Sequence, residues 1–199
     1  MLKLCFNKQR MKLSSIHKIL LISSSLWFFG EGLLGPLFAV FSEKIGGDIL
    51  DITWAWAIYL ILSGALYVFF GRVLRHSNYK QHAMLFGYFL NAVLTFGYLF
   101  VHHTYQLFLL QVGFAIAESI STPVWDALFA SDLERADDSL FWGIAGGHSH
   151  IITGIAVAIG GLITYYISFE ALFIIMGCIQ LMSTAVQFQL LRLNRQAKS

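Results

Sequence analysis

Long apolar stretches, separated by short polar ones, run through the whole chain. Six apolar segments can be delimited, at residues 19–41, 52–70, 83–101, 105–130, 140–166 and 171–191. Each has roughly the 20 residues that a helix needs to cross the hydrocarbon core of a bilayer. None shows sustained alternation of apolar and polar residues, which argues against a transmembrane β-barrel. The pattern predicts an all-α membrane protein with six transmembrane helices.

The composition agrees with a membrane protein. Hydrophobic residues make up 57% of the chain and charged residues 12%, against about 25% charged in soluble domains. The first apolar segment is too long for a signal-peptide core, so we expect it to be retained. No nucleophile–base pair or nucleotide-binding loop is visible, so we expect neither an enzyme nor a cofactor. Topology explains the basic tail, so no nucleic-acid partner is expected.

Basic residues are distributed unevenly between the two faces that six spans would create. If both termini share a face, that face carries twelve Lys and Arg residues and the other carries only Lys44. The positive-inside rule then places both termini in the cytoplasm of a multi-pass protein of the cell (inner) membrane. The predicted organisation is a basic cytoplasmic tail (1–18), a six-helix transmembrane bundle (19–191) and a second cytoplasmic tail (192–199), with inner loops at 71–82 and 131–139 and outer loops at 42–51, 102–104 and 168–170.

Two similar frames recur 87 residues apart. Glu31 is followed five residues later by Pro36, and Glu118 is followed at the same spacing by Pro123; these are the only two prolines. The offset suggests two copies of one unit, at about 16–101 and about 103–188. Because each copy holds three spans, the second runs opposite to the first. Such inverted repeats are typical of secondary transporters.

Glu31 and Glu118 lie near the middle of the first and fourth segments. A charge at that depth costs about 2.5–3.5 kcal/mol on insertion scales, so such residues usually face a cavity, where they can bind substrate or a proton. The alternative is a protonated glutamate hydrogen-bonded to a neighbouring helix. Pro36 and Pro123 are expected to kink their helices. The kinks would serve gating, unless these are ordinary membrane-helix prolines.

Three local features add to the pattern of spans: the basic tail, the end of the first segment (PLFAVF, 36–41) and the start of the sixth (FEALF, 169–173). Together with a short basic loop after the second segment, they resemble the amino-terminal half of the major facilitator superfamily over essentially the whole chain. Members of that family normally have twelve spans in two halves. The resemblance therefore implies the fold of one half, with the second half missing.

In that family the loop after the second helix carries a motif of glycines, an acid and basic residues. Gly71 and Lys80 match it, whereas Arg75 replaces its acid and Asn78 its second glycine. An acid at the inner end of the fourth helix pairs with this loop in the family. The resemblance thus implies a structural ion pair of Asp126 with Arg72 or Arg75. It also implies that the first and fourth helices line the central cavity, which would direct their glutamates toward substrate.

Two further features of the fifth segment allow alternative interpretations. His148 and His150 point to different sides of a helix, with no Cys or acid at ligand spacing, so we expect no metal site. His148 could instead line the cavity or relay protons. A stripe of small residues permits close helix contact, either within the bundle or at a dimer seam; it consists of Gly143, Gly147, Gly154 and Gly161.

The sequence therefore predicts a secondary transporter of a small solute, with Glu31 and Glu118 as candidates for coupling transport to protons. The spans contain no Lys or Arg, which favours a neutral or cationic solute. Six helices form only one wall of a cavity, so we expect a half-transporter that acts as a parallel homodimer or with a second half. The alternative is a truncated or split remnant, or a helical scaffold subunit without transport activity. A scaffold has no use for two glutamates at mid-depth.

Overall fold

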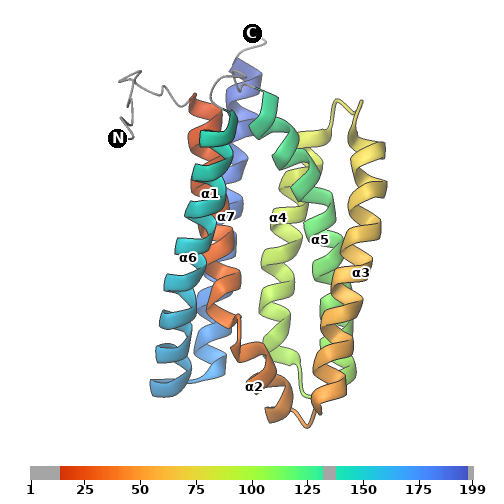
Figure 1. The fold of residues 1–199 in the computed structure, drawn as a ribbon, viewed down its shortest axis with the longest axis vertical. Coiled ribbons are helices and arrows are strands. Elements are labelled where there is room, and N and C mark those ends of the chain that lie inside the picture. The colour runs from red at the N-terminus through yellow and green to blue at the C-terminus, as the bar shows by residue number, and fades with distance from the viewer. Residues whose placement is uncertain (1–13, 132–137, 197–199) are drawn as a thin grey trace, which may run out of the picture.

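Helices form all of the regular secondary structure in the part of the chain that the structure describes. The computed structural model describes residues 14–131 and 138–196. Its helices are α1 (Ser15–Leu34), α2 (Leu37–Lys44), α3 (Ile49–Leu74), α4 (Lys80–Gly97), the short 3₁₀ helix η1 (Tyr98–Phe100), α5 (Thr104–Ser131), α6 (Asp138–Tyr166) and α7 (Phe169–Gln196) (Figure 1). Each predicted apolar segment coincides with one helix or with a pair of consecutive helices.

Five helical segments are long and apolar enough to cross a membrane, namely α3, α4 with η1, α5, α6 and α7. The pair α1 and α2 forms a sixth if it counts as one span, bent by 48° at its break. The break falls at Gly35, whose φ is positive at 20°, and at Pro36, which has no N–H to continue the helix. Pro123, in contrast, lies inside α5, which continues through it without interruption.

The helices pack in a fixed order. α3 packs on α5, α5 on α4, α4 on α7, α7 on α1 and α1 on α6. As a result α3 and α6 lie at the two edges of the bundle (Figure 1). This set of pairs stays the same when α1, α3 and α4 are exchanged with α5, α6 and α7, respectively.

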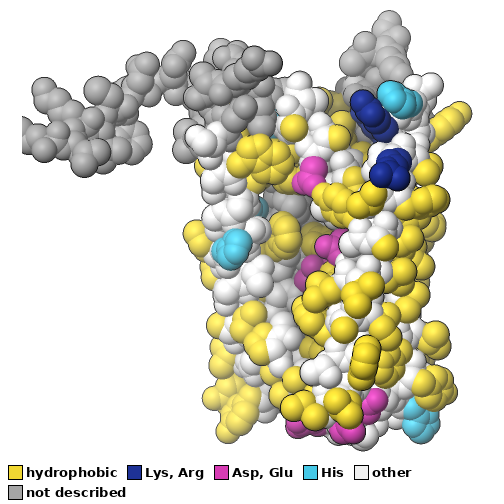
Figure 2. Space-filling model, turned by 45° about the vertical axis from the view of Figure 1, so that its right-hand side comes forward, with side chains coloured by type: hydrophobic (Ala, Val, Ile, Leu, Met, Phe, Trp, Pro, Cys, Tyr) yellow, Lys and Arg dark blue, Asp and Glu magenta, His cyan; other side chains and the backbone are white. Residues whose placement is uncertain are grey.

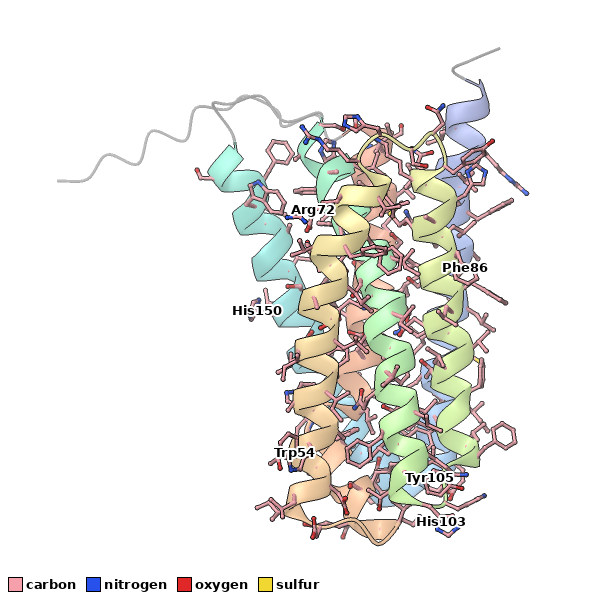
Figure 3. All side chains as sticks on the ribbon, turned by 90° about the vertical axis from the view of Figure 1, so that its right-hand side faces the viewer. Trp54, Arg72, Phe86, His103, Tyr105 and His150 are labelled. Carbon is pink, nitrogen blue, oxygen red and sulfur yellow. The ribbon has the colours of Figure 1, made fainter. Side chains whose placement is uncertain are left out.

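The outer surface of the bundle is apolar along its length. Ile61, Leu109 and Ile151 are each about two-thirds or more exposed, on three different helices. Exposed aromatic side chains mark the end that carries α2, among them Trp54 and Tyr105 (Figure 3). Such aromatic residues favour the membrane–water interface. The bundle is therefore a multi-pass membrane protein.

Polar side chains join α1 to α7 inside the bundle. The Ser23 hydroxyl donates to Gln187 Oε1 at 2.6 Å, and the Ser183 hydroxyl donates to the Ser23 carbonyl at 2.7 Å. The Gln180 amide also donates to the Trp27 carbonyl at 3.1 Å. Hydrogen bonds between helices are among the forces that hold bundles together in a bilayer, where apolar burial provides little.

The contact of α1 with α6 depends on Gly160. A Cβ atom added there would lie 1.9 Å from the Leu33 carbonyl oxygen. The predicted glycine stripe does not make this contact, since a Cβ added at any of its members would meet nothing within 4 Å. The stripe thus lies on a face of α6 that the described residues leave open, and the interpretation that it packs inside the bundle is not supported.

The described ends of the chain, at the start of α1 and the end of α7, lie at one end of the bundle, and α2 lies at the other (Figure 1). Residues 1–13, 132–137 and 197–199 are outside the described part. The predictions made for most of the tail 1–18, for most of the inner loop 131–139 and for the last three residues of the tail 192–199 therefore fall outside it too.

Candidate functional site

Two adjoining cavities lie within the bundle. The one whose lining includes Phe38 of α2 is called the lower cavity, because α2 lies at the lower end of the bundle in Figure 1, and the other is called the upper cavity. The lower cavity holds about 610 Å³ of empty space, counting the part open to the outside, and the upper one about 560 Å³. The lower cavity is lined by Glu31, Leu34, Gly35, Phe38, Trp56, Tyr59, Thr95, Tyr98, Gln111, Phe114 and Met176. The upper cavity is lined by Ser24, Trp27, Phe28, Glu31, Tyr88, Glu118, Ser121, Thr122, Trp125 and Asp126.

Glu31 belongs to both linings, and its side chain is accessible within the cleft. Its neighbours in the sequence explain this orientation. Gly30 packs against Gln180 of α7, and Gly32 packs against Ala156 of α6. The two glycines let α1 lie close to both helices, so the residue between them is left on the opposite side, facing the cleft.

Glu118 is held by the edge helix α3. The Tyr59 hydroxyl donates to Glu118 Oε2 at 2.5 Å, and the hydroxyl of the next residue, Ser119, donates to the Ser63 carbonyl at 3.0 Å. Glu118 and Glu31 line the same upper cavity. The structure thus brings together the two acids that the sequence placed in different spans.

Asp126 has a different partner from the expected one. The Tyr67 hydroxyl donates to its carboxylate, and within 14–131 and 138–196 no ion pair joins Asp126 to Arg72 or Arg75. Both arginines are exposed, and Arg72 lies near the upper end of α3 (Figure 3). Asp126 lines the upper cavity instead. Tyr67 explains the difference. It lies more than one turn of α3 before either arginine, at the level of the Asp126 carboxylate, and takes the place of an arginine as its partner.

Sequence analysis missed both tyrosines. Tyr59 and Tyr67 are eight residues apart on α3, and their partners Glu118 and Asp126 are eight apart on α5. Because the spacing is the same on both helices, the second contact repeats the first about two turns further along them. Matching pairs of donors and acids on two apolar segments are a signal that could have predicted the contact.

His148 lies away from the cleft. Its Nε2 atom is hydrogen-bonded to the Ser25 hydroxyl at 2.6 Å, between α6 and α1, and neither cavity lining includes it. His148 thus joins two helices, and its predicted role as a proton relay stays a prediction. His150 lies on the outer side of α6 (Figure 3). In the described residues no three His, Cys, Asp or Glu side chains gather as metal ligands.

The cleft is lined by acidic side chains. Figure 2 shows acidic side chains in the hollow between the two sides of the bundle, and the acids of the two linings are Glu31, Glu118 and Asp126. No Lys, Arg or His belongs to the described lining of either cavity. An ion pair that the structure does contain, Lys44 with Glu170 at 3.8 Å, is exposed at the α2 end. The cleft thus brings three acids together without a basic side chain in the described linings.

The lower cavity also contains an amide side chain. Gln111 is 3% exposed and belongs to the lining. The Gln111 amide is therefore available to a molecule in the cavity.

A bundle of apolar helices around a cleft lined by acids is typical of multi-pass membrane proteins that contain a polar pathway. The family model of the Major Facilitator Superfamily matches residues 20–199. The chain therefore belongs to the Major Facilitator Superfamily, as the resemblance predicted. Membership suggests a transporter of the major facilitator type, since members of this family are transporters rather than enzymes. No curated protein gives a significant match to the chain.

Proposed function

We propose that the protein is a secondary transporter that moves a small solute through the cleft and couples this movement to protons through Glu31 and Glu118. The observation that carries the proposal is the position of Glu31, an accessible acid in the lining of both cavities. An acid at the junction can exchange a solute or a proton with either side. Acids inside membrane helices usually mark such pathways.

The paired acids support coupling to protons. Two carboxylates in one cavity of low dielectric repel each other, and binding a proton or a cation relieves this repulsion. The hydrogen bond from Tyr59 fixes Glu118, while Glu31 remains accessible. The scaffold alternative explains neither feature, because a scaffold needs no accessible acids.

The order of helix packing supports two inverted three-helix repeats. The exchange that leaves the packing pairs unchanged matches α1 with α5, and these are the helices that carry Glu31 and Glu118. In transporters built this way, one unit rocks against another around a fixed site at the repeat interface. The cleft between α1 and α5 is in the place where such a site is expected.

A second six-helix unit across the cleft completes the proposed transporter, most simply as a second copy in parallel orientation. The open glycine face of α6 supports such a neighbour, because small residues let another helix approach closely. Both termini are proposed to be cytoplasmic in the cell (inner) membrane, on the basis of the distribution of basic residues.

The test uses purified protein in liposomes with an imposed pH gradient and a pH-sensitive dye inside. The probes are glucose, alanine, tetraethylammonium and lactate, one for each charge class of solute. We expect solute-driven proton flux with at least one probe other than lactate. Glu31→Gln and Glu118→Gln should abolish accumulation against a gradient, while exchange down a gradient survives.

Glu43→Gln is the matched control, because Glu43 is an exposed acid on α2 outside both linings. It should transport like the wild type. Full proton-driven accumulation by the Glu31→Gln/Glu118→Gln double variant, or the absence of proton flux with all four probes, would contradict the proposal.

A further inference from the structure

Aromatic rings line both cavities that meet at Glu31. In the lower cavity the Trp56 ring lies 5.9 Å from that of Phe38 and 5.4 Å from that of Tyr59, measured between centroids. In the upper cavity the Trp27 and Tyr88 rings are 4.6 Å apart in an edge-to-face arrangement. Rings that pack on one another form stiff walls, and their faces attract positive charge.

The acids of the cleft also favour a positively charged ligand. Its linings contain three acids and, among the described residues, no basic side chain. Carboxylates enclosed by apolar walls are costly unless a proton or a cation neutralises them. A positively charged ligand would provide the charge that the protein does not.

The Gln111 amide favours a ligand that carries a hydrogen-bonding group. The residue is 3% exposed and belongs to the lower lining, so its amide can meet a molecule in that cavity. A buried amide gains from a hydrogen bond that the ligand supplies. The ligand should therefore carry a polar group beside its charge.

We propose that the cleft binds a monovalent organic cation with an apolar body and one hydrogen-bonding group. The cationic nitrogen lies near Glu31, aromatic faces surround it, and the polar group reaches Gln111. The inference rests on the proposed function only in that the same cleft is the transport route.

Other ligand classes fit the cleft less well. The three acids repel an anion, and a metal ion lacks a cluster of three ligands among the described residues. A neutral polyol could stack on the rings and donate to the carboxylates, but it would leave their charge unbalanced. The choice between an organic cation and a polyol is therefore a question of charge, which a pair of isosteres can answer.

The experiment is calorimetric binding to the wild-type protein in lipid nanodiscs without any gradient. The cationic probe is benzyl(2-hydroxyethyl)dimethylammonium, and the neutral probe is its carbon isostere, 3,3-dimethyl-4-phenylbutan-1-ol. The two differ only in replacement of the charged nitrogen by carbon. We expect the cation to bind at least about tenfold more tightly, as a charge pair in low dielectric should provide. Equal affinities, or tighter binding of the neutral isostere or of glucose, would overturn the proposal.

Variants locate the site. Glu31→Gln should weaken binding of the cation by about tenfold or more and leave the isostere unaffected, and Trp56→Leu should weaken it by about twofold to thirtyfold. Removing the hydroxyl, with benzylethyldimethylammonium as the probe, should lower affinity for the wild type and not for Gln111→Leu. Glu43→Gln is the control and should bind like the wild type. Unchanged binding of the cation by a folded Glu31→Gln variant would place it elsewhere and overturn the proposal.

Binding and transport can fail separately. If the cation binds but no probe is transported, the proposed transport function fails and the binding site stands. If a neutral solute is transported with protons but the cation does not bind, the function stands and the ligand class is wrong.

Discussion

Two adjacent glycines of α6 allow the contact of α1 with α6 to be tested, because Gly160 packs against α1 and Gly161 faces open space. A Cβ at Gly160 would lie 1.9 Å from the Leu33 carbonyl oxygen, against the 3.0 Å below which real Cβ contacts essentially never occur. A Cβ at Gly161 would meet nothing within 4 Å. Gly160→Ala should therefore destabilise the bundle, and Gly161→Ala should not.

The magnitude follows from two opposing terms. Replacing glycine by alanine inside a helix favours the helix by up to about 1 kcal/mol, and both variants gain this equally. Only Gly160→Ala also forces two helix backbones apart, because a carbonyl in a helix cannot rotate away as a side chain can. Overpacking of this kind costs about 1–3 kcal/mol. The difference in unfolding free energy between the two variants isolates that cost.

The assay is reversible unfolding in mixed micelles, titrated with a denaturing detergent and followed by tryptophan fluorescence. We expect the Gly160→Ala variant to be less stable than the Gly161→Ala variant by about 1–3 kcal/mol. Equal stability of the two variants would show that α1 and α6 do not approach each other this closely, and the packing described for Gly160 would be refuted.

Three further predictions concern polar contacts and topology. Tyr59→Phe removes the donor to Glu118 and should cost about 0.6–2 kcal/mol in the same unfolding assay, whereas Tyr105→Phe, at an exposed position, should cost nothing measurable. A double-mutant cycle of Ser23→Ala and Gln187→Ala should give a coupling energy of about 0.6 kcal/mol; zero coupling would mean that the α1–α7 hydrogen bond is absent. In a background with Cys5 and Cys178 replaced by serine, an impermeant thiol reagent applied to intact cells should label Glu43→Cys and spare Asn78→Cys, and the reverse pattern would invert the proposed orientation.

Membrane-spanning segments could be predicted from the sequence because hydropathy is a local property. In a bilayer each span must satisfy its own backbone hydrogen bonds, so an apolar stretch of sufficient length is already a helix. The six predicted segments correspond to α1 with α2, α3, α4 with η1, α5, α6 and α7. The place of Glu31 and Glu118 in mid-segment, and the break at Pro36, follow from the same local information.

The partners of the polar side chains could not be predicted in this way. Asp126 was expected to pair with an arginine two helices earlier in the sequence, and it accepts from Tyr67 instead. His148 was expected in the cavity, and it contacts Ser25. Both outcomes depend on how far each helix is rotated about its own axis and shifted along it. A nearly uniform apolar sequence does not specify these two quantities.

The glycines of α6 show most clearly which properties the sequence determines and which depend on helix packing. The sequence established that α6 would be a helix and that it carries a stripe of glycines. Only packing against α1 decided that Gly160 takes the contact and that the stripe from Gly143 to Gly161 stays open. Rotation is decided by steric fit between two helices, a property of the pair that neither segment contains alone. The same packing directs Glu31 into the cleft. The sequence alone determined how deep this acid lies in its span, but not which side of the helix it faces.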